Sequence, residues 1–441
     1  MCKKKIAILG STGSIGRSSL SVLESLGPDY RLISASAHSR WRMLAEQARK
    51  YRLQKVVLTD TTHLAELKNA LVDTDTEVLG GPEHLADLAA DPACDTVIVA
   101  VVGVAGLAAV MAATEAGKTV AIANKESLVV AGCILMPLAR RTGATILPVD
   151  SEHSAILQAM HAGRRSEVRK AIITCSGGPF RQASAEQITS ASLADALNHP
   201  TWDMGPKITI DSATMMNKAL EIVEAHWLFD LSADQIEVLI HPESIIHSLV
   251  EFCDGSVIAQ MSRPDMCLPI QYALTHPHRL PCPAPALNLH QLGRLHFEEP
   301  DPQRFPALRL GFEVARTGGT AGAVLNAANE VAVEAFRAER IGLGQIAELA
   351  EHCLRKHNWI GNPNLQQLLE LDSWARQEVS DCLTKGTTDD VGGNIGNDVD
   401  GNIDDNSGVG GSLGKGPTVA ISDYAPADRS AKQVTVAKKN D

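Results

Sequence analysis

The chain has 441 residues, of which 44% are hydrophobic and 21% are charged, and its formal net charge is −12. This length predicts two or three domains, and this composition is typical of a globular protein. The negative charge without a basic stripe argues against a nucleic-acid partner, and the lack of long apolar stretches argues against a membrane span or an export signal. Nine cysteines without C-x-x-C spacing argue against a disulfide framework or a zinc site, so we expect a cytosolic protein with reduced thiols.

The first predicted strand, Lys3–Leu9, enters a glycine-rich turn, Gly10–Gly16, and a helical pattern follows to Leu26. In this context the backbone of such a turn approaches a pyrophosphate at the N-terminus of the helix. The G-x-x-G-x-x-G spacing by itself also fits a tight turn without a ligand. The order of strand, turn and helix favours dinucleotide binding.

A second predicted strand, Leu32–Ala37, indicates which dinucleotide the chain binds. NAD enzymes usually place an acid after this strand to hold the ribose hydroxyls, but this chain has no acid there. His38, Ser39 and Arg40 occupy these positions, and their side chains suit a 2′-phosphate. The sequence therefore predicts NADPH rather than NADH.

Three further apolar runs, residues 55–60, 95–103 and 119–123, alternate with helical patterns. Near-continuous apolar strands of this kind indicate a parallel sheet that is buried on both faces. The polar tripeptide Asn124–Glu126 directly follows the third run, and doubly wound sheets bind ligands at the carboxyl ends of their strands. Residues 1–150 are therefore predicted to form a Rossmann-like domain that binds NADPH.

Two acids, Asp150 and Glu152, follow the strand-like run 144–150 and are the most informative pair in the chain. On extended backbone their i, i+2 spacing points both carboxylates the same way, and like charges that close require a cation or a proton between them. Glu221 adds a third carboxylate in a segment rich in hydroxyl, amide and ammonium groups. The set predicts a hard divalent cation beside a phosphorylated substrate, with an exposed loop of ordinary acids as the alternative.

The rest of the chain divides by composition. Residues 151–280 alternate strands and helices and are predicted to form a catalytic α/β domain. The proline-rich segment 281–306 is predicted to be an irregular connector, and residues 307–383 are predicted to form an all-α domain of amphipathic helices. Residues 384–441 are dominated by Gly, Asn, Asp and Ser, so we expect a disordered acidic tail. Part of this tail faintly resembles a calcium loop but lacks the flanking helices and the bidentate Glu.

Two segments of the predicted catalytic domain are candidates for ligand binding. Ser176 lies in a glycine turn after a strand, where its hydroxyl and nearby N–H groups could hold an anion, although a plain tight turn fits equally. His199, Trp202 and Met204 lie in a loop between proline and glycine residues. A bulky aromatic in such a loop suits a lid that closes over a ligand, with an ordinary core position as the alternative.

A third segment combines the hydroxyl of Ser212, the amide of Asn217 and the ammonium group of Lys218 before and within the first turns of a predicted helix. These groups can converge on a phosphate with help from the helix dipole, and N-capping by Asp211 or Ser212 is the alternative. His241 and His247 lie in a fourth segment, where we expect hydrogen-bonded structural histidines rather than catalytic ones.

Seven longer motifs occur in this chain in the order Gly10-Ser-Thr-Gly-Ser-Ile-Gly16, Ala123-Asn-Lys-Glu126, Val149-Asp-Ser-Glu-His153, Ser176-Gly-Gly-Pro-Phe-Arg181, Asp211-Ser-Ala-Thr-Met-Met-Asn-Lys218, His241-Pro-Glu-Ser-Ile-Ile-His247 and Asn326-Ala-Ala-Asn-Glu330. Together they resemble the 1-deoxy-D-xylulose 5-phosphate reductoisomerase family from the first strand to about residue 383. The resemblance implies NADPH-dependent rearrangement and reduction of this phosphorylated ketose to 2-C-methyl-D-erythritol 4-phosphate in the non-mevalonate isoprenoid pathway. It also implies a cytoplasmic homodimer that needs Mg²⁺, Mn²⁺ or Co²⁺.

The resemblance also implies a role for individual residues. Metal ligands are expected at Asp150, Glu152 and Glu221, and these three act in catalysis with Lys125 and His199. Substrate contacts are expected from Lys125, Ser151, Glu152, Ser176, His199, Ser212, Asn217, Lys218 and Glu221. Cofactor contacts are expected from Thr12, Gly13, Ser14, Ile15, Ala37, His38, Ser39, Asn124, Glu126 and Gly205. The Ala37–Ser39 segment departs from the Gly-Lys-Asn of some members, which leaves the strength of 2′-phosphate binding open.

The expected metal would act as a Lewis acid and template on two vicinal substrate oxygens. Both a retro-aldol route and a direct migration fit the sequence. Two other functions also remain open. One is a different NADP-dependent oxidoreductase, such as a semialdehyde or homoserine dehydrogenase, and the other is a non-catalytic NADP-binding sensor. Neither needs three carboxylates beside a Ser–Asn–Lys set.

Overall fold

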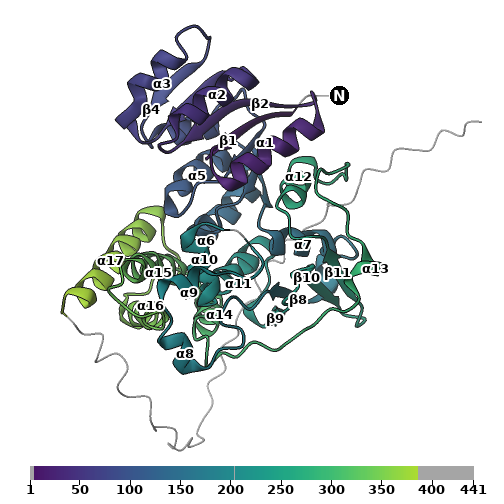
Figure 1. Cartoon of the computed structure of the whole chain (residues 1–441), viewed down its shortest axis with the longest axis vertical. Helices are drawn as coiled ribbons and strands as arrows, with labels where there is room; N and C mark the ends of the chain where they lie inside the picture. Colours follow the sequence, from purple (N-terminus) through teal and green to yellow (C-terminus); the bar gives the residue numbers. More distant parts are fainter. Residues whose placement is uncertain (1–3, 203, 386–441) are drawn as a thin grey trace, which may run out of the picture. The chain divides into compact units, whose positions relative to one another are not determined.

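A parallel sheet of seven strands occupies the first 150 residues of the computed structural model, which describes residues 4–202 and 204–385 (Figure 1). The strands are β1 (Lys4–Leu9), β2 (Tyr30–Ala37), β3 (Lys55–Leu58), β4 (Glu77–Gly80), β5 (Thr96–Val99), β6 (Thr119–Ile122) and β7 (Thr145–Pro148). Their spatial order is β4-β3-β2-β1-β5-β6-β7, and every neighbouring pair is parallel. The order reverses between β1 and β5, and doubly wound sheets bind ligands at such a switch point.

Helices cover both faces of this sheet: α1 (Ser14–Leu26), α2 (Trp41–Tyr51), α3 (Leu64–Ala70), α4 (His84–Ala90), α5 (Leu107–Glu115) and α6 (Lys125–Thr142). Successive side chains of a strand point to opposite faces, so in β1 Ile6 and Ile8 enter the core shared with α1 and α2, and Ala7 and Leu9 enter the core shared with α4, α5 and α6. The double burial explains the near-continuous apolar strands. The predicted Rossmann-like fold is confirmed.

The glycine turn after β1 fits closely against the loop after β5. Gly10 has a φ of +86°, and a Cβ atom there would lie 2.5 Å from the carbonyl oxygen of Ala100. Only glycine combines this backbone conformation with such a close approach. The turn therefore lies at the switch point, directly before the N-terminus of α1.

The second sheet has the order β11-β10-β8-β9, in which β8 pairs with β9 in parallel and β10 pairs with β8 and β11 antiparallel. The elements of this region are α7 (Ser151–Met160), β8 (Val168–Cys175), α8 (Ala185–Thr189), α9 (Leu193–Leu197), α10 (Pro206–Ala213), α11 (Met216–Phe229), β9 (Ile236–Ile240), β10 (Ile246–Phe252), β11 (Val257–Met261) and α12 (Cys267–Thr275). β10 is missing from the predicted strands, because His247 and Ser248 interrupt its apolar pattern although both are buried. Helix α12 packs against α1, so Ile270 and Leu274 join a core of the first sheet.

After the short helix α13 (Leu289–Leu292), four helices end the described chain (Figure 1): α14 (Ala307–Thr317), α15 (Ala321–Arg337), α16 (Gln345–Lys356) and α17 (Leu365–Lys385). The predicted helical C-terminal region is confirmed. One hydrophobic core joins its Leu325 and Leu349 with Ile173 of β8 and Leu220 of α11. No helix within residues 4–202 and 204–385 is both long and apolar enough to cross a membrane. The predicted disordered tail falls, from residue 386 onward, outside the described residues.

Helices α15 and α6 touch at backbone distance, and this contact generates a stability prediction. A Cβ atom at Gly322 would lie 2.0 Å from the carbonyl oxygen of Val129. Gly322→Ala should therefore force the helices apart and destabilise the protein by about 1–3 kcal/mol, as overpacking does. Thermal unfolding measures this loss. Gly344→Ala is the control, since a Cβ atom there meets nothing within 4 Å; an equal melting temperature in both variants would contradict the prediction.

Candidate active site

A cavity of about 450 Å³ lies at the junction of the first sheet, the second sheet and helices α10 and α11. It brings together most of the residues that the sequence analysis singles out. Those that line it are Ser14, Ile15, Lys125, Asp150, Ser151, Glu152, Ser176, His199, Gly205, Ser212, Asn217, Lys218 and Glu221. Those that do not are Thr12, Gly13, Ala37, His38, Ser39, Asn124 and Glu126.

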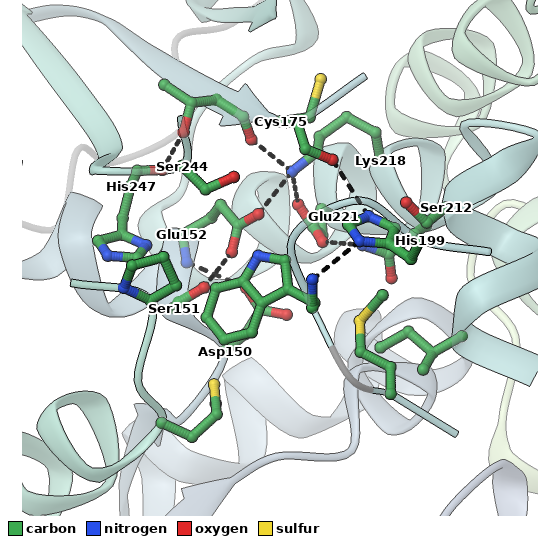
Figure 2. A pocket seen from close by; sticks show the side chains of 18 of the residues that line it. Asp150, Ser151, Glu152, Cys175, His199, Ser212, Lys218, Glu221, Ser244 and His247 are labelled. Atoms are coloured by element: carbon green, nitrogen blue, oxygen red, sulfur yellow. Dashed lines mark hydrogen bonds and ion pairs between the residues drawn. The ribbon is translucent and has the colours of Figure 1, made fainter. Parts of the chain in front are cut away.

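The three predicted metal ligands meet in this cavity (Figure 2). Single oxygen atoms of Asp150, Glu152 and Glu221 lie within 4.8 Å of one another. The expectation that Asp150 and Glu152 lie on extended backbone is wrong. Asp150 caps α7, its side chain accepts from the backbone N–H of Glu152 at 3.2 Å, and Glu152 belongs to the first turn of the helix. The helix dipole favours a carboxylate N-cap, so Asp150 both caps α7 and belongs to the carboxylate cluster.

Two buried lysines neutralise most of this charge (Figure 2). The Nζ atom of Lys125 lies 2.8 Å from Asp150 Oδ2 and 3.0 Å from Glu221 Oε1, and that of Lys218 lies 2.9 Å from Glu152 Oε1 and also contacts Glu221. Burial lowers the pKa of Lys125, but Asp150 and Glu221 outweigh burial and hold it well above its ordinary value. Burial and the neighbouring Glu152 raise the pKa of Glu221. Three carboxylates and two ammonium groups leave one negative charge.

The donor set fits a divalent metal ion. Its three ligand candidates are all carboxylates, which hard cations such as Mg²⁺ prefer, and one net negative charge remains to be compensated. The sequence analysis predicts the same three residues from their spacing and resemblance.

His153 lies directly behind Asp150 and is missing from the predicted site. Its Nδ1 atom lies 3.1 Å from Asp150 Oδ1 and 3.4 Å from Glu224 Oε2, and its Nε2 atom donates to the carbonyl oxygen of Glu221 at 2.9 Å. Burial lowers the pKa of His153, but Glu224 and Asp150 outweigh this and raise it to about 9. Burial raises the pKa of Glu224 to about 7. The i, i+3 spacing from Asp150 is the sequence signal that could have revealed this contact.

At the other end of the cavity, hydroxyl and N–H groups converge. Ser176 is followed by Gly177 and Gly178, with φ values of +84° and +65°, and the N–H of Gly178 donates to Ser176 Oγ at 3.2 Å. Ser212 lies in the last turn of α10, directly before α11, the helix that carries Asn217 and Lys218. A Cβ atom at Gly178 would lie 2.8 Å from the carbonyl oxygen of Ser212, so the glycine turn and α10 fit tightly together.

The loop before α10 contributes Trp202, Met204 and Gly205 to the cavity, and residue 203 is outside the described part. His199 organises this loop. Its Nδ1 atom accepts from the backbone N–H groups of Thr201 and Trp202 at 3.1 and 3.0 Å, so its Nε2 atom carries the proton and donates to Ser176 Oγ at 3.1 Å. Burial lowers the pKa of His199 and keeps the ring neutral.

The predicted cofactor residues surround the glycine turn. Ser14 and Ile15 line the cavity, and the guanidinium of Arg40 donates to the carbonyl oxygen of Thr12 at 2.9 Å. Asn124 caps α6, and its amide donates to the carbonyl oxygens of residues 101 and 103 at 2.7 Å each. This amide therefore fixes the loop after β5. Ala37 is buried, whereas His38 and Ser39 are exposed.

Trp202 and Met204 of the predicted lid also line the cavity. Several other cavity residues are absent from the predicted site: Ser18, Ala123, Thr174, Cys175, Gly177, Gly178, Ile208, Met215, Ser244, Ile246, His247, Pro264, Asp265 and Met266. Ser244 has a φ of +52°. Figure 2 shows its side chain and that of His247 at the cavity, which both residues line. His247 was expected to be structural, and its Nε2 atom is bonded to the hydroxyl of Ser262 at 2.9 Å. The segment that carries Ser244 and His247 has neither the spacing of metal ligands nor that of a catalytic nucleophile. Its residue spacing therefore does not indicate that these two residues line the cavity.

Three family models match the chain. Residues 6–132 match the model described as 1-deoxy-D-xylulose 5-phosphate reductoisomerase, and residues 146–229 match its C-terminal domain. Residues 261–378 match a further model, described as the DXP reductoisomerase C-terminal domain. The three matches follow one another along most of the described chain.

Whole proteins of this description are also similar. The 1-deoxy-D-xylulose 5-phosphate reductoisomerase of Pelotomaculum thermopropionicum is 50% identical over 374 residues, which cover 85% of this chain and 97% of the relative. The Zymomonas mobilis enzyme in complex with NADPH is 41% identical, with a TM-score of 0.82 and coverage of 86% and 99%. A DOX-P reductoisomerase in complex with NADPH, fosmidomycin and magnesium is 41% identical, with a TM-score of 0.83 and coverage of 87% and 99%. The chain belongs to the 1-deoxy-D-xylulose 5-phosphate reductoisomerase family.

Proposed function

We propose that the chain rearranges 1-deoxy-D-xylulose 5-phosphate and reduces the product with NADPH to 2-C-methyl-D-erythritol 4-phosphate, in isoprenoid precursor biosynthesis. The observation that carries this proposal is a single cavity where a Rossmann-type glycine turn, three carboxylates and a Ser–Asn–Lys set meet. Family membership and the NADPH and magnesium complexes of similar structures support it. A different NADP-dependent oxidoreductase or a non-catalytic sensor is not favoured, because neither explains the carboxylates.

Asp150, Glu152 and Glu221 are the residues that would hold the divalent cation. When bound, the cation supplies Lewis-acid polarisation of adjacent substrate oxygens. Lys125 and Lys218 keep these acids in place and carry protons next to them, so each Nζ atom can donate to an oxygen that gains negative charge. Ser151, beside Glu152 in the cavity, supplies a further donor to the substrate.

The substrate phosphate is assigned to Ser176, Ser212, Asn217 and Lys218, all of which line the cavity. Asn217 and Lys218 also contact Glu221 and so lie next to the carboxylates. Hydroxyl, amide and ammonium donors suit a phosphate, and the N–H groups of a turn with two positive φ values form a concave anion site. Binding energy gained on the phosphate, away from the reacting carbons, can position those carbons at the carboxylates.

The loop 198–205 is assigned the role of a lid. His199 ties it to Ser176 through the Nε2–H···Oγ bond, so a group bound at Ser176 also meets the lid. Trp202 and Met204 place apolar surface along the cavity, which excludes water from the reacting carbons. Ser14 and Ile15 line the cavity at the glycine turn.

NADPH supplies the hydride when bound. Its contacts are assigned to Thr12, Gly13, Ser14, Ile15, Ala37, His38, Ser39, Asn124, Glu126 and Gly205. The exposed residues His38 and Ser39 after β2 and the guanidinium of Arg40 suit a 2′-phosphate, and none of the three is an acid.

The larger organisation is part of the same proposal. Residues 1–150 would bind the cofactor, 151–280 the metal and the substrate, 281–306 would connect, and 307–383 would support the site with helices. A cytoplasmic homodimer is proposed from the family resemblance. A similar solved structure is a complex with NADPH, fosmidomycin and magnesium.

Removing single acids tests the metal assignment. Asp150→Asn or Glu221→Gln should lower metal-dependent turnover at least about a thousandfold, because a lost carboxylate removes both a ligand and a partner of Lys125. The Kd for NADPH should stay nearly unchanged. Steady-state kinetics with added Mn²⁺ and cofactor fluorescence measure the two quantities. Glu251→Gln, an acid of β10 paired with Arg169, is the control. Wild-type turnover in either site variant removes that residue from the metal site.

The end of β2 predicts cofactor choice. NADPH should be preferred to NADH, and Ser39→Asp should reduce the ratio of the two kcat/KM values by about tenfold, because a carboxylate would repel the 2′-phosphate. The kcat/KM with NADH is the internal control and should not fall. Equal efficiencies of the wild type with both cofactors would contradict the assignment.

Phosphonohydroxamates such as fosmidomycin should inhibit, with two hydroxamate oxygens toward the acids and the phosphonate toward Ser212. Ser212→Ala should raise the inhibition constant and the KM for substrate together, by about five- to tenfold, since one hydrogen bond to a charged group is lost. Inhibition assays at fixed Mn²⁺ measure both. Removal of the divalent ion should abolish tight binding. An inhibitor that binds equally tightly to metal-free protein would overturn the arrangement.

A further inference from the structure

Helix α10 connects the lid to the phosphate end of the cavity and has two different sides. Ile208 and Ser212, four residues apart, line the cavity. Lys207 and Asp211, also four apart, do not, and their side chains contact other elements. An i, i+4 pair lies on one side of a helix, so the charged pair and the cavity-lining pair form neighbouring stripes.

The charged stripe ties α10 to two other helices. Lys207 Nζ lies 2.7 Å from Asp211 Oδ2 and 3.4 Å from Glu126 Oε1, at the start of α6. Asp211 Oδ1 accepts from the side-chain amide of Asn329, in α15, at 2.9 Å. We call Glu126, Lys207, Asp211 and Asn329 the α10 clamp. Asn329 belongs to the Asn326–Glu330 motif, for which the proposed function gives no role.

The clamp is shielded from water, so its charges depend on one another. The side chain of Asp211 is 2% exposed, that of Glu126 is 10% exposed and that of Lys207 is 18% exposed. Burial lowers the pKa of Lys207, but Asp211 and Glu126 outweigh it, and the lysine stays charged. Removing one partner of a buried ion pair is costly because an uncompensated charge remains, whereas removing both can be nearly neutral.

A shift of α10 would reach the phosphate end directly. The carbonyl oxygen of Ser212 packs against the Gly178 turn so closely that a Cβ atom on Gly178 would lie 2.8 Å away. Ser176 lies in the glycine turn and Ser212 in α10, so the two hydroxyl groups of the proposed phosphate pocket belong to the two segments that touch here. Their spacing therefore depends on where α10 sits, and the lid joins the other end of the same helix at Gly205.

We propose that Lys207 is a positioning residue: through the α10 clamp it sets the place of α10, and thereby the phosphate pocket and the lid, without touching the substrate. The inference rests on the proposed function, in which Ser176 and Ser212 bind phosphate. It gives Asn329 the role of anchoring the same helix to α15.

The test compares Lys207→Met with the double variant Lys207→Met/Asp211→Asn. The single variant leaves Asp211 uncompensated, so the KM for 1-deoxy-D-xylulose 5-phosphate should rise about tenfold, with a smaller fall in kcat. The double variant removes both charges, and KM should return to within about threefold of wild type. Glu126 keeps the side-chain amide hydrogen bond from Asn124 in both variants, so the loss of Lys207 affects it equally in each. Lys118→Met is the control, at a buried lysine that does not line the cavity and precedes the opposite end of β6, and it should lower the melting temperature without changing KM.

Calorimetric binding of inorganic phosphate gives a second readout that needs no turnover. It should weaken in the single variant and recover in the double variant. If the wild type fails to convert the substrate, the proposed function is wrong. The phosphate affinities of the two variants would still test whether the α10 clamp positions the phosphate pocket. A KM and a phosphate affinity near wild type in Lys207→Met would overturn the inference. The inference would also be overturned if KM and phosphate affinity did not recover in the double variant. That result would show that the loss of packing, and not the unpaired charge of Asp211, causes the effect.

Discussion

Two buried ammonium groups hold three carboxylates together at the centre of the cavity, and the rest of the site depends on this balance. The one negative charge left over attracts a cation but is small enough for the cluster to stay folded around Lys125 and Lys218. Asp150, Glu152 and Glu221 would hold a divalent cation there. The ammonium groups of Lys125 and Lys218 beside them would donate to an anionic substrate, since an ammonium group has three donors and no acceptor.

Lys125 and Asp150 meet because they lie at the ends of neighbouring strands and at the start of the helices that follow them. Lys125 begins α6 directly after β6, and Asp150 caps α7 directly after β7, the neighbouring strand. Carboxyl ends of adjacent parallel strands meet at one edge of a sheet, so two residues 25 positions apart arrive side by side. Glu221 and Lys218 reach the same point from α11, on which they lie three residues apart.

The sequence was sufficient to predict the elements that have a periodic apolar pattern and the site residues that belong to a distinctive motif. Alternating apolar strands and the glycine turn predict the first sheet, and the acids at 150, 152 and 221 predict the centre of the cavity. The same approach gave the wrong backbone for Glu152, which lies in the first turn of α7, because the strand-like run ends at Asp150, where the helix is capped. It did not find β10, whose apolar pattern His247 and Ser248 interrupt. It also missed His153, although the i, i+3 spacing from Asp150 was available, and Ser244, which lines a cavity that segments far apart in sequence form together.

The core shared by the second sheet and the C-terminal helices bears on how the protein is made. Translation releases β8 of the catalytic sheet more than 130 residues before α14, and residues from 129 to 382 contribute to this one core. Helices α7 and α11 cover the emerging sheet early, but the apolar side of α11 that packs against α14 stays uncovered until the last helices leave the ribosome. Apolar surface exposed in that interval is prone to aggregation, so completion of the C-terminal helices removes this hazard.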